Sequence, residues 1–249
     1  MSVTLALTLL GAAESSSWNR VVAALQLIAE EHHETLELSD PDARRRRQEQ
    51  LQQRLGEVLP LVPWPGLRAG VEALRGRLVG TDFEVGSTAR GLIRQIFERA
   101  PIRRAPPSKP DLARGKKLYL QSCAACHGPD ATGDSPIAAT MDPPPTDLLH
   151  PRQNWSPYDM FIRTTYGGAQ TAMPSFEEGL SKMKRWDIVY FLFAERWPPC
   201  EKPLPPLRAD ELAVLGDYEL AKRFGYGAAA CLRRKFLPPA QPASRKRPR

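Results

Sequence analysis

The stretch Cys123-Ala124-Ala125-Cys126-His127 decides how this chain is interpreted. Two thiols three positions apart, followed directly by a histidine, suit covalent haem attachment, because each thiol can add to one vinyl group and the histidine then lies beneath the iron. A CxxC pair alone also occurs in thioredoxin-like and zinc sites. The other cysteines, Cys200 and Cys231, are isolated, and no βαβ pattern surrounds the motif. The sequence therefore predicts one covalently bound haem c.

The composition is that of a soluble protein with a substantial core. The chain has 249 residues, 42% of them hydrophobic, which is enough for two domains. Its net charge of +7 is concentrated near the C-terminus, which ends Arg245-Lys246-Arg247-Pro248-Arg249. Such a tail is either a solvated end or a contact for anionic lipid or an acidic partner. No apolar run approaches the roughly 20 residues that span a bilayer, so we expect a soluble or peripheral protein that binds no nucleic acid.

Residues 1–13 form a weak candidate signal peptide. An apolar run from Leu5 to Leu10 is followed by small residues, but the segment has no Lys or Arg to make the usual positive start. A start codon placed too far downstream would explain that defect. Because covalent haem attachment in bacteria is expected outside the cytoplasm, we expect a periplasmic or otherwise extracytoplasmic location.

Residues 14–100 predict a small helical bundle. Trp18, Val21, Val22, Leu25 and Ile28 recur at helical spacing from about Ser17 onward. Three further amphipathic segments follow, at about 42–59, 67–79 and 88–99, and prolines separate the first two. Residues 101–110 are rich in proline and predict an extended linker.

One helix of this bundle carries a cluster of histidines and glutamates. Glu30 and His33 have the Glu-x-x-His spacing found in di-iron carboxylate bundles. Such sites need a second copy of the motif, which this sequence lacks. We therefore interpret the cluster as a solvated polar face and keep weak metal binding as a hypothesis.

Residues 111–199 predict the haem domain. Asp111 can cap a helix that runs into Cys123, and Gly115 and Tyr119 share one face of it. We expect this face to cross the helix after Ser181, whose apolar stripe consists of Trp186, Val189, Tyr190 and Phe193. A glycine at the crossing allows close approach.

With these features the chain resembles a class I c-type cytochrome. In that family one helix ends at CxxCH, crosses a C-terminal helix, and a loop between them supplies the sixth iron ligand. The loop here contains Thr171-Ala172-Met173-Pro174, the family's usual setting for an axial methionine, so the resemblance implies that His127 and Met173 are the axial ligands. His150 is the other strong candidate for the sixth position.

The same resemblance implies a role for the loop before residue 150. In the family a proline-rich loop offers a backbone carbonyl to the ring N–H of the axial histidine, and Asp142-Pro143-Pro144-Pro145-Thr146-Asp147-Leu148 fits that description. Ser156, Pro157 and Asp159 then predict the start of a short helix that ends at Gly167.

A second resemblance covers more of the chain. The helical region, CAACHG, the DPPPTDL loop, TAMPSF and the stretches at 207–212 and 229–234 are similar to the cytochrome portion attached to some bacterial Ftr-type iron permeases. This chain has no membrane helices and no Arg-Glu-x-x-Glu motif, so we do not expect it to transport iron itself.

These inferences combine into one prediction. The fold is all-α, with a class I cytochrome c domain preceded by a small helical bundle and followed by a short helical, basic tail at 200–249. The function is electron transfer, serving an iron permease or a respiratory chain. An enzyme such as a peroxidase needs an open iron position, which Met173 would fill; an iron-binding or redox-sensing module is the alternative. In an oxidising compartment Cys200 and Cys231 are candidates for a disulfide.

Overall fold

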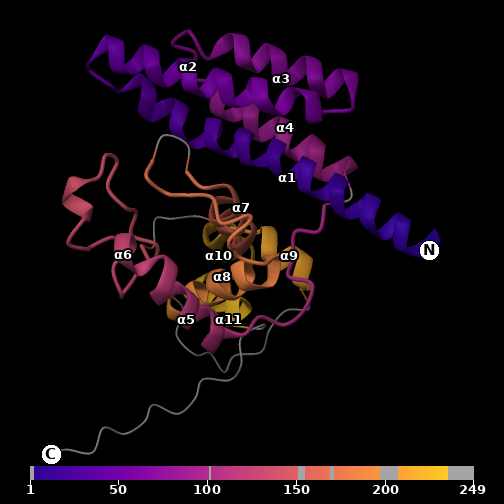
Figure 1. Ribbon diagram of the computed structural model, residues 1–249, viewed down its shortest axis with the longest axis vertical. Helices are drawn as coiled ribbons and strands as arrows, with labels where there is room; N and C mark the ends of the chain where they lie inside the picture. The colour runs from indigo at the N-terminus through magenta and orange to yellow at the C-terminus, as the bar shows by residue number, and fades with distance from the viewer. Residues whose placement is uncertain (1–2, 101, 151–154, 169–170, 197–206, 235–249) are drawn as a thin grey trace, which may run out of the picture. The chain divides into compact units, whose positions relative to one another are not determined.

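The computed structural model describes residues 3–100, 102–150, 155–168, 171–196 and 207–234 (Figure 1). All regular secondary structure in these ranges is helical, which confirms the predicted all-α class. The chain divides into two compact units. One contains residues Met1–Arg103 and Tyr166–Ser175, and the other contains Arg104–Thr165 and Phe176–Arg249.

The first unit is built on four α-helices. They are α1 (Val3–Leu36), α2 (Pro41–Val58), α3 (Pro65–Arg77) and α4 (Val85–Arg99), with a 3₁₀ turn η1 (Leu59–Leu61) after α2. Each helix packs against the next, and α1 also packs against α4, which closes the bundle. The predicted stripe on α1 is buried, as are Leu92, Ile93 and Ile96 on α4. The apolar periodicity of the sequence therefore identified the bundle core.

The start of α1 differs from the sequence prediction. The helix begins at Val3, whereas the apolar stripe predicted a start near Ser17. No proline lies between Val3 and Ser17, and leucine and alanine favour a helix, so the helical backbone continues through this stretch. A continuous helix does not test cleavage, and the signal peptide stays a prediction.

The second unit contains the CxxCH stretch. Its helices are α5 (Leu112–Ser122), α6 (Ala124–His127), α7 (Pro157–Tyr166, of which the last residue is grouped with the first unit) and α8 (Lys182–Arg196), with a 3₁₀ turn η2 (Ala138–Thr140). As predicted, Ser156 and Asp159 cap α7: the Asp159 N–H donates to Ser156 Oγ at 3.1 Å, and the Ser156 N–H donates to Asp159 Oδ2 at 2.9 Å. Gly167, with φ +76°, follows the last residue of α7.

The C-terminal helices have more core than the sequence suggested. They are α9 (Ala209–Val214), α10 (Asp217–Phe224) and α11 (Tyr226–Arg234), and α11 packs against α8. Six buried apolar residues form a cluster of their own: Leu212, Leu215, Leu220, Ala221, Ala229 and Leu232. The tail therefore includes a folded layer of the second unit.

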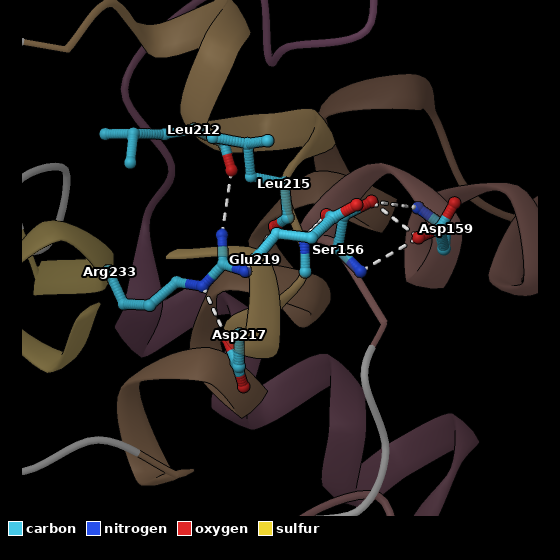
Figure 2. A network of polar contacts seen from close by, with 8 residues as sticks. Ser156, Asp159, Leu212, Leu215, Asp217, Glu219 and Arg233 are labelled. Atoms are coloured by element: carbon cyan, nitrogen blue, oxygen red, sulfur yellow. Dashed lines mark hydrogen bonds and ion pairs between the residues drawn. The ribbon is translucent and has the colours of Figure 1, made fainter. Parts of the chain in front are cut away.

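A buried arginine joins these helices (Figure 2). Arg233 is 3% exposed, and its Nε donates to Asp217 Oδ1 at 2.7 Å. Its guanidinium also donates to the carbonyls of Leu212, at 2.8 Å, and Leu215, and lies 4.9 Å from the centre of the Phe193 ring on α8. One side chain thus ties α9, α10 and α11 to each other and to α8.

Candidate haem-binding site

The CxxCH stretch forms a single helical turn at the end of α5. The Asp111 side chain accepts the Arg114 N–H at 3.0 Å and so caps the start of α5, as predicted. At the other end, the carbonyl of Cys123 accepts the N–H groups of Cys126, at 3.1 Å, and His127, at 2.9 Å. Residues three apart on a helix lie on the same side, so both thiols are presented together.

The α5–α8 crossing is confirmed, but a different face of α8 makes it. A Cβ atom at Gly115 would lie 2.1 Å from the carbonyl oxygen of Asp187, and the Tyr119 ring lies 5.7 Å from that of Phe191. Part of the predicted stripe faces α7 instead, since the Trp186 ring stacks on the Phe161 ring with their centres 4.2 Å apart. Because α8 is buried on several sides, its apolar pattern could not identify which face meets α5.

A buried carboxylate that no sequence pattern indicated fixes this crossing. Asp187 is fully buried, accepts the Asp111 N–H at 2.8 Å and accepts Arg114 Nε at 2.6 Å. A buried charge is stable only when it is paired and hydrogen-bonded, as it is here. Asp187 therefore holds the first turn of α5 against α8.

The ring of His127 is oriented by the proline-rich loop. Its Nδ1 lies 3.0 Å from the carbonyl oxygen of Thr146, which confirms the predicted loop contact. Because a carbonyl only accepts hydrogen bonds, Nδ1 carries the proton and Nε2 is the nitrogen left to bind a metal. Burial lowers the pKa of His127, and this favours the neutral imidazole that a metal requires.

Two glycines shape the loop around this histidine. Gly128 and Gly133 have φ of +76° and +79°, in the left-handed region that favours glycine. A Cβ at Gly133 would lie 2.4 Å from the Pro145 carbonyl oxygen, next to Thr146. Gly128 directly follows His127 in the sequence, and a glycine at that position was the one available sign of a tight turn after the histidine.

The state of the two thiols argues against a redox CxxC pair. Cys123 and Cys126 are both half-buried. Burial raises the pKa of Cys123 to about 12. A dithiol that exchanges disulfides needs a lowered thiol pKa, because the thiolate is the reactive form. Two half-buried thiols beside an oriented histidine fit haem attachment instead.

The loop around Met173 is held by its own hydrogen bonds. Thr171 Oγ1 accepts the Met173 N–H at 3.2 Å, and the Gly168 N–H donates to the Met173 carbonyl at 3.3 Å. Residues 169–170 lie outside the described ranges. Met173 is half-buried and belongs to the first unit, whereas His127 belongs to the second. Ligation by Met173 therefore stays a prediction.

The competing ligand candidates have other environments. His150 is exposed, and Met141 is half-buried. Met160 is buried on α7, and Met183 on α8 has its sulfur 3.5 Å from Ser108 Oγ.

The Glu-x-x-His cluster presents a different pair to the bundle interior than the one the spacing singled out. Glu31 and His32 are buried, whereas Glu30 is half-buried and His33 is exposed. Within the described ranges, no three His, Cys, Asp or Glu side chains are grouped so that they could hold a metal ion. The weak-metal hypothesis gains no support from this part of the chain.

For the predicted disulfide, the structure describes only one of the two cysteines. Cys231 is buried and is not a free thiol. Cys200 lies outside the described ranges, so the pairing stays a prediction. None of the described helices combines the length and hydrophobicity of a membrane-spanning segment.

A comparison with protein-family models agrees with this site. Residues 110–192 match the family model described as cytochrome C oxidase, cbb3-type, subunit III. A solved chain of the reducing HAO-like protein complex of Kuenenia stuttgartiensis is 27% identical, with a TM-score of 0.35; the match covers 47% of this chain and 62% of that one, less than two thirds of its length. No curated protein sequence matches the chain.

The iron-permease resemblance has no counterpart among these matches. The family match spans the CxxCH turn, the loop that contacts His127, and α8 as far as Leu192. From this match and the geometry of the CxxCH turn, we conclude that the chain contains a c-type cytochrome segment and carries a covalently bound haem c.

Proposed function

We propose that this protein is an electron carrier in which Cys123 and Cys126 form the thioether bonds to haem and His127 is the proximal iron ligand. The observation that carries the proposal is the hydrogen bond between His127 Nδ1 and the Thr146 carbonyl, which holds the ring and leaves Nε2 for iron. The bound haem supplies the one-electron chemistry. The chain supplies the ligands, their orientation and the burial that together set the reduction potential.

Met173 is the sixth ligand in this proposal. The Thr171 and Gly168 hydrogen bonds support it, because they fix the backbone on both sides of the methionine. A thioether ligand raises the potential relative to a second histidine. With both axial positions filled, the protein exchanges electrons with partner proteins and does not bind a substrate at iron.

A respiratory oxidase is the acceptor that the matched family supports best. That family is described as a subunit of a cytochrome c oxidase. The iron-permease system rests on the sequence resemblance alone. In either case we place the protein outside the bacterial cytoplasm, where haem is attached to CxxCH. Fractionation of cells with a haem stain tests the location, and haem-stained protein confined to the cytoplasm would contradict it.

Replacement of the methionine tests the ligand set. Met173→Ala in the holoprotein should abolish the weak long-wavelength band associated with methionine ligation and should lower the midpoint potential. Met141→Ala, another loop methionine, is the matched control and should change neither. An unchanged spectrum in Met173→Ala, together with an altered one in His150→Ala, would show that the sixth ligand is His150.

A further inference from the structure

Tyr119 is a fully buried hydroxyl donor close to the iron-binding histidine. It lies on α5, and its hydroxyl donates to the carbonyl of Gly128 at 2.6 Å. Burial raises the pKa of Tyr119 well above its ordinary value, so the hydroxyl keeps its proton. Its ring packs against Phe191 on α8. The ring and the hydroxyl therefore have separate partners.

The acceptor of this hydrogen bond is the residue directly after His127. Gly128 is confined, because a Cβ there would lie 2.5 Å from the Asp134 carbonyl oxygen. Its carbonyl also accepts the Ala131 N–H at 3.2 Å, and Ala131 has a left-handed φ of +59°. Tyr119 thus braces a tight turn whose first peptide group is joined to the histidine.

This turn is also hydrogen-bonded to the loop that orients the histidine. The Leu148 N–H donates to the Ala131 carbonyl at 2.9 Å. Two residues earlier, the Thr146 carbonyl accepts His127 Nδ1–H at 3.0 Å. The Gly133 N–H closes the network at the His127 carbonyl, at 2.9 Å. Hydrogen bonds joined by short backbone segments therefore connect the Tyr119 hydroxyl to the His127 ring.

We propose that Tyr119 is a positioning residue for His127: its hydroxyl holds the turn that keeps the Thr146 carbonyl on the histidine ring and so tunes the reduction potential. The inference rests on the proposed role of His127 as an iron ligand. A carbonyl that accepts the Nδ1 proton makes the imidazole a stronger electron donor, which stabilises ferric iron. Loss of the Tyr119 hydroxyl should loosen that contact and raise the potential.

Tyr119→Phe tests the inference because it removes one oxygen and keeps the ring on Phe191. Tyr190→Phe is the matched control. Tyr190 is also buried, at 3% exposure, and within the described ranges its hydroxyl has no hydrogen-bond partner. Both holoproteins are compared with the parent by potentiometric titration and by NMR measurement of the exchange of the His127 ring N–H.

We expect Tyr119→Phe to raise the midpoint potential. We also expect its ring N–H to exchange roughly three- to tenfold faster than in the parent, as the loss of an ordinary hydrogen bond implies. Tyr190→Phe should match the parent in both measurements. A parental potential and exchange rate in Tyr119→Phe, or equal changes in both variants, would overturn the inference. A parent haem without histidine ligation would overturn the proposed function instead, so the two failures are distinguishable.

Discussion

Replacing Gly115 with alanine tests the helix crossing that presents the haem-binding turn. The added Cβ would lie 2.1 Å from the Asp187 carbonyl oxygen, 2.6 Å from its carbonyl carbon and 3.0 Å from Phe191 Cβ. Ordinary contact begins at 3.4 Å, so the backbone of α8 must retreat by 3.4 − 2.1 = 1.3 Å at this point. Since the first two neighbours are backbone atoms, rotation of a side chain cannot relieve the clash.

Two opposing effects set the expected magnitude. Alanine favours a helix interior over glycine by about 1 kcal/mol. Overpacking a core typically costs 1–3 kcal/mol, occasionally more, and a clash with rigid backbone belongs at or above the upper end. The Asp111 and Arg114 contacts to Asp187 would also be strained. We therefore expect a net loss of about 2 kcal/mol, which lowers the melting temperature by roughly 4–8 °C in a protein of this size.

Thermal unfolding of the ferric holoprotein, followed by haem absorbance and by circular dichroism, measures this loss. Gly91→Ala on α4 is the control, because a Cβ there meets nothing within 4 Å. That substitution should be neutral or stabilising by up to about 1 kcal/mol. If Gly115→Ala melts at or above the parent temperature, the close approach of α5 and α8 is refuted.

Three further predictions concern other parts of the chain. Burial raises the pKa of Glu31 to about 7, so the protonated side chain stabilises the bundle at acid pH, and this stability falls as the pH rises from about 4 to 7. In urea unfolding, Glu31→Gln should lack this decline, which is up to about 3 kcal/mol in the parent. An unchanged decline in the variant would contradict the raised pKa of Glu31. Arg233→Met leaves Asp217 buried without its partner and should cost roughly 3–5 kcal/mol, whereas parental stability in urea would refute the role of the pair. Thiol titration of the unfolded, unreduced holoprotein should find no reactive thiol if Cys200 pairs with Cys231, and two reactive thiols would exclude the bridge.

Local patterns in the sequence were sufficient for the main features of the structure. The spacing of Cys123, Cys126 and His127 alone predicts haem attachment, so this prediction needed no tertiary information. Capping residues and glycines located the ends of α5 and α7, because their roles depend only on neighbouring backbone. The partner of α5 could be inferred because a glycine on an apolar face permits a close helix crossing.

The sequence could not reveal contacts between distant side chains. No sequence pattern singled out Asp187, and its partners Asp111 and Arg114 are more than seventy positions away. Arg233 lies in a basic C-terminal region, and its burial depends on a core formed by three short helices. Periodicity also failed on α8, because a helix buried on several sides has no single apolar stripe.

Mass spectrometry of the purified protein tests the central claim most directly. After denaturation and acid–acetone extraction, the intact chain should keep the mass of one haem, and proteolysis should assign that haem to the peptide containing Cys123, Cys126 and His127. A haem that extracts freely, or a CxxCH peptide of unmodified mass, would contradict covalent attachment at this site.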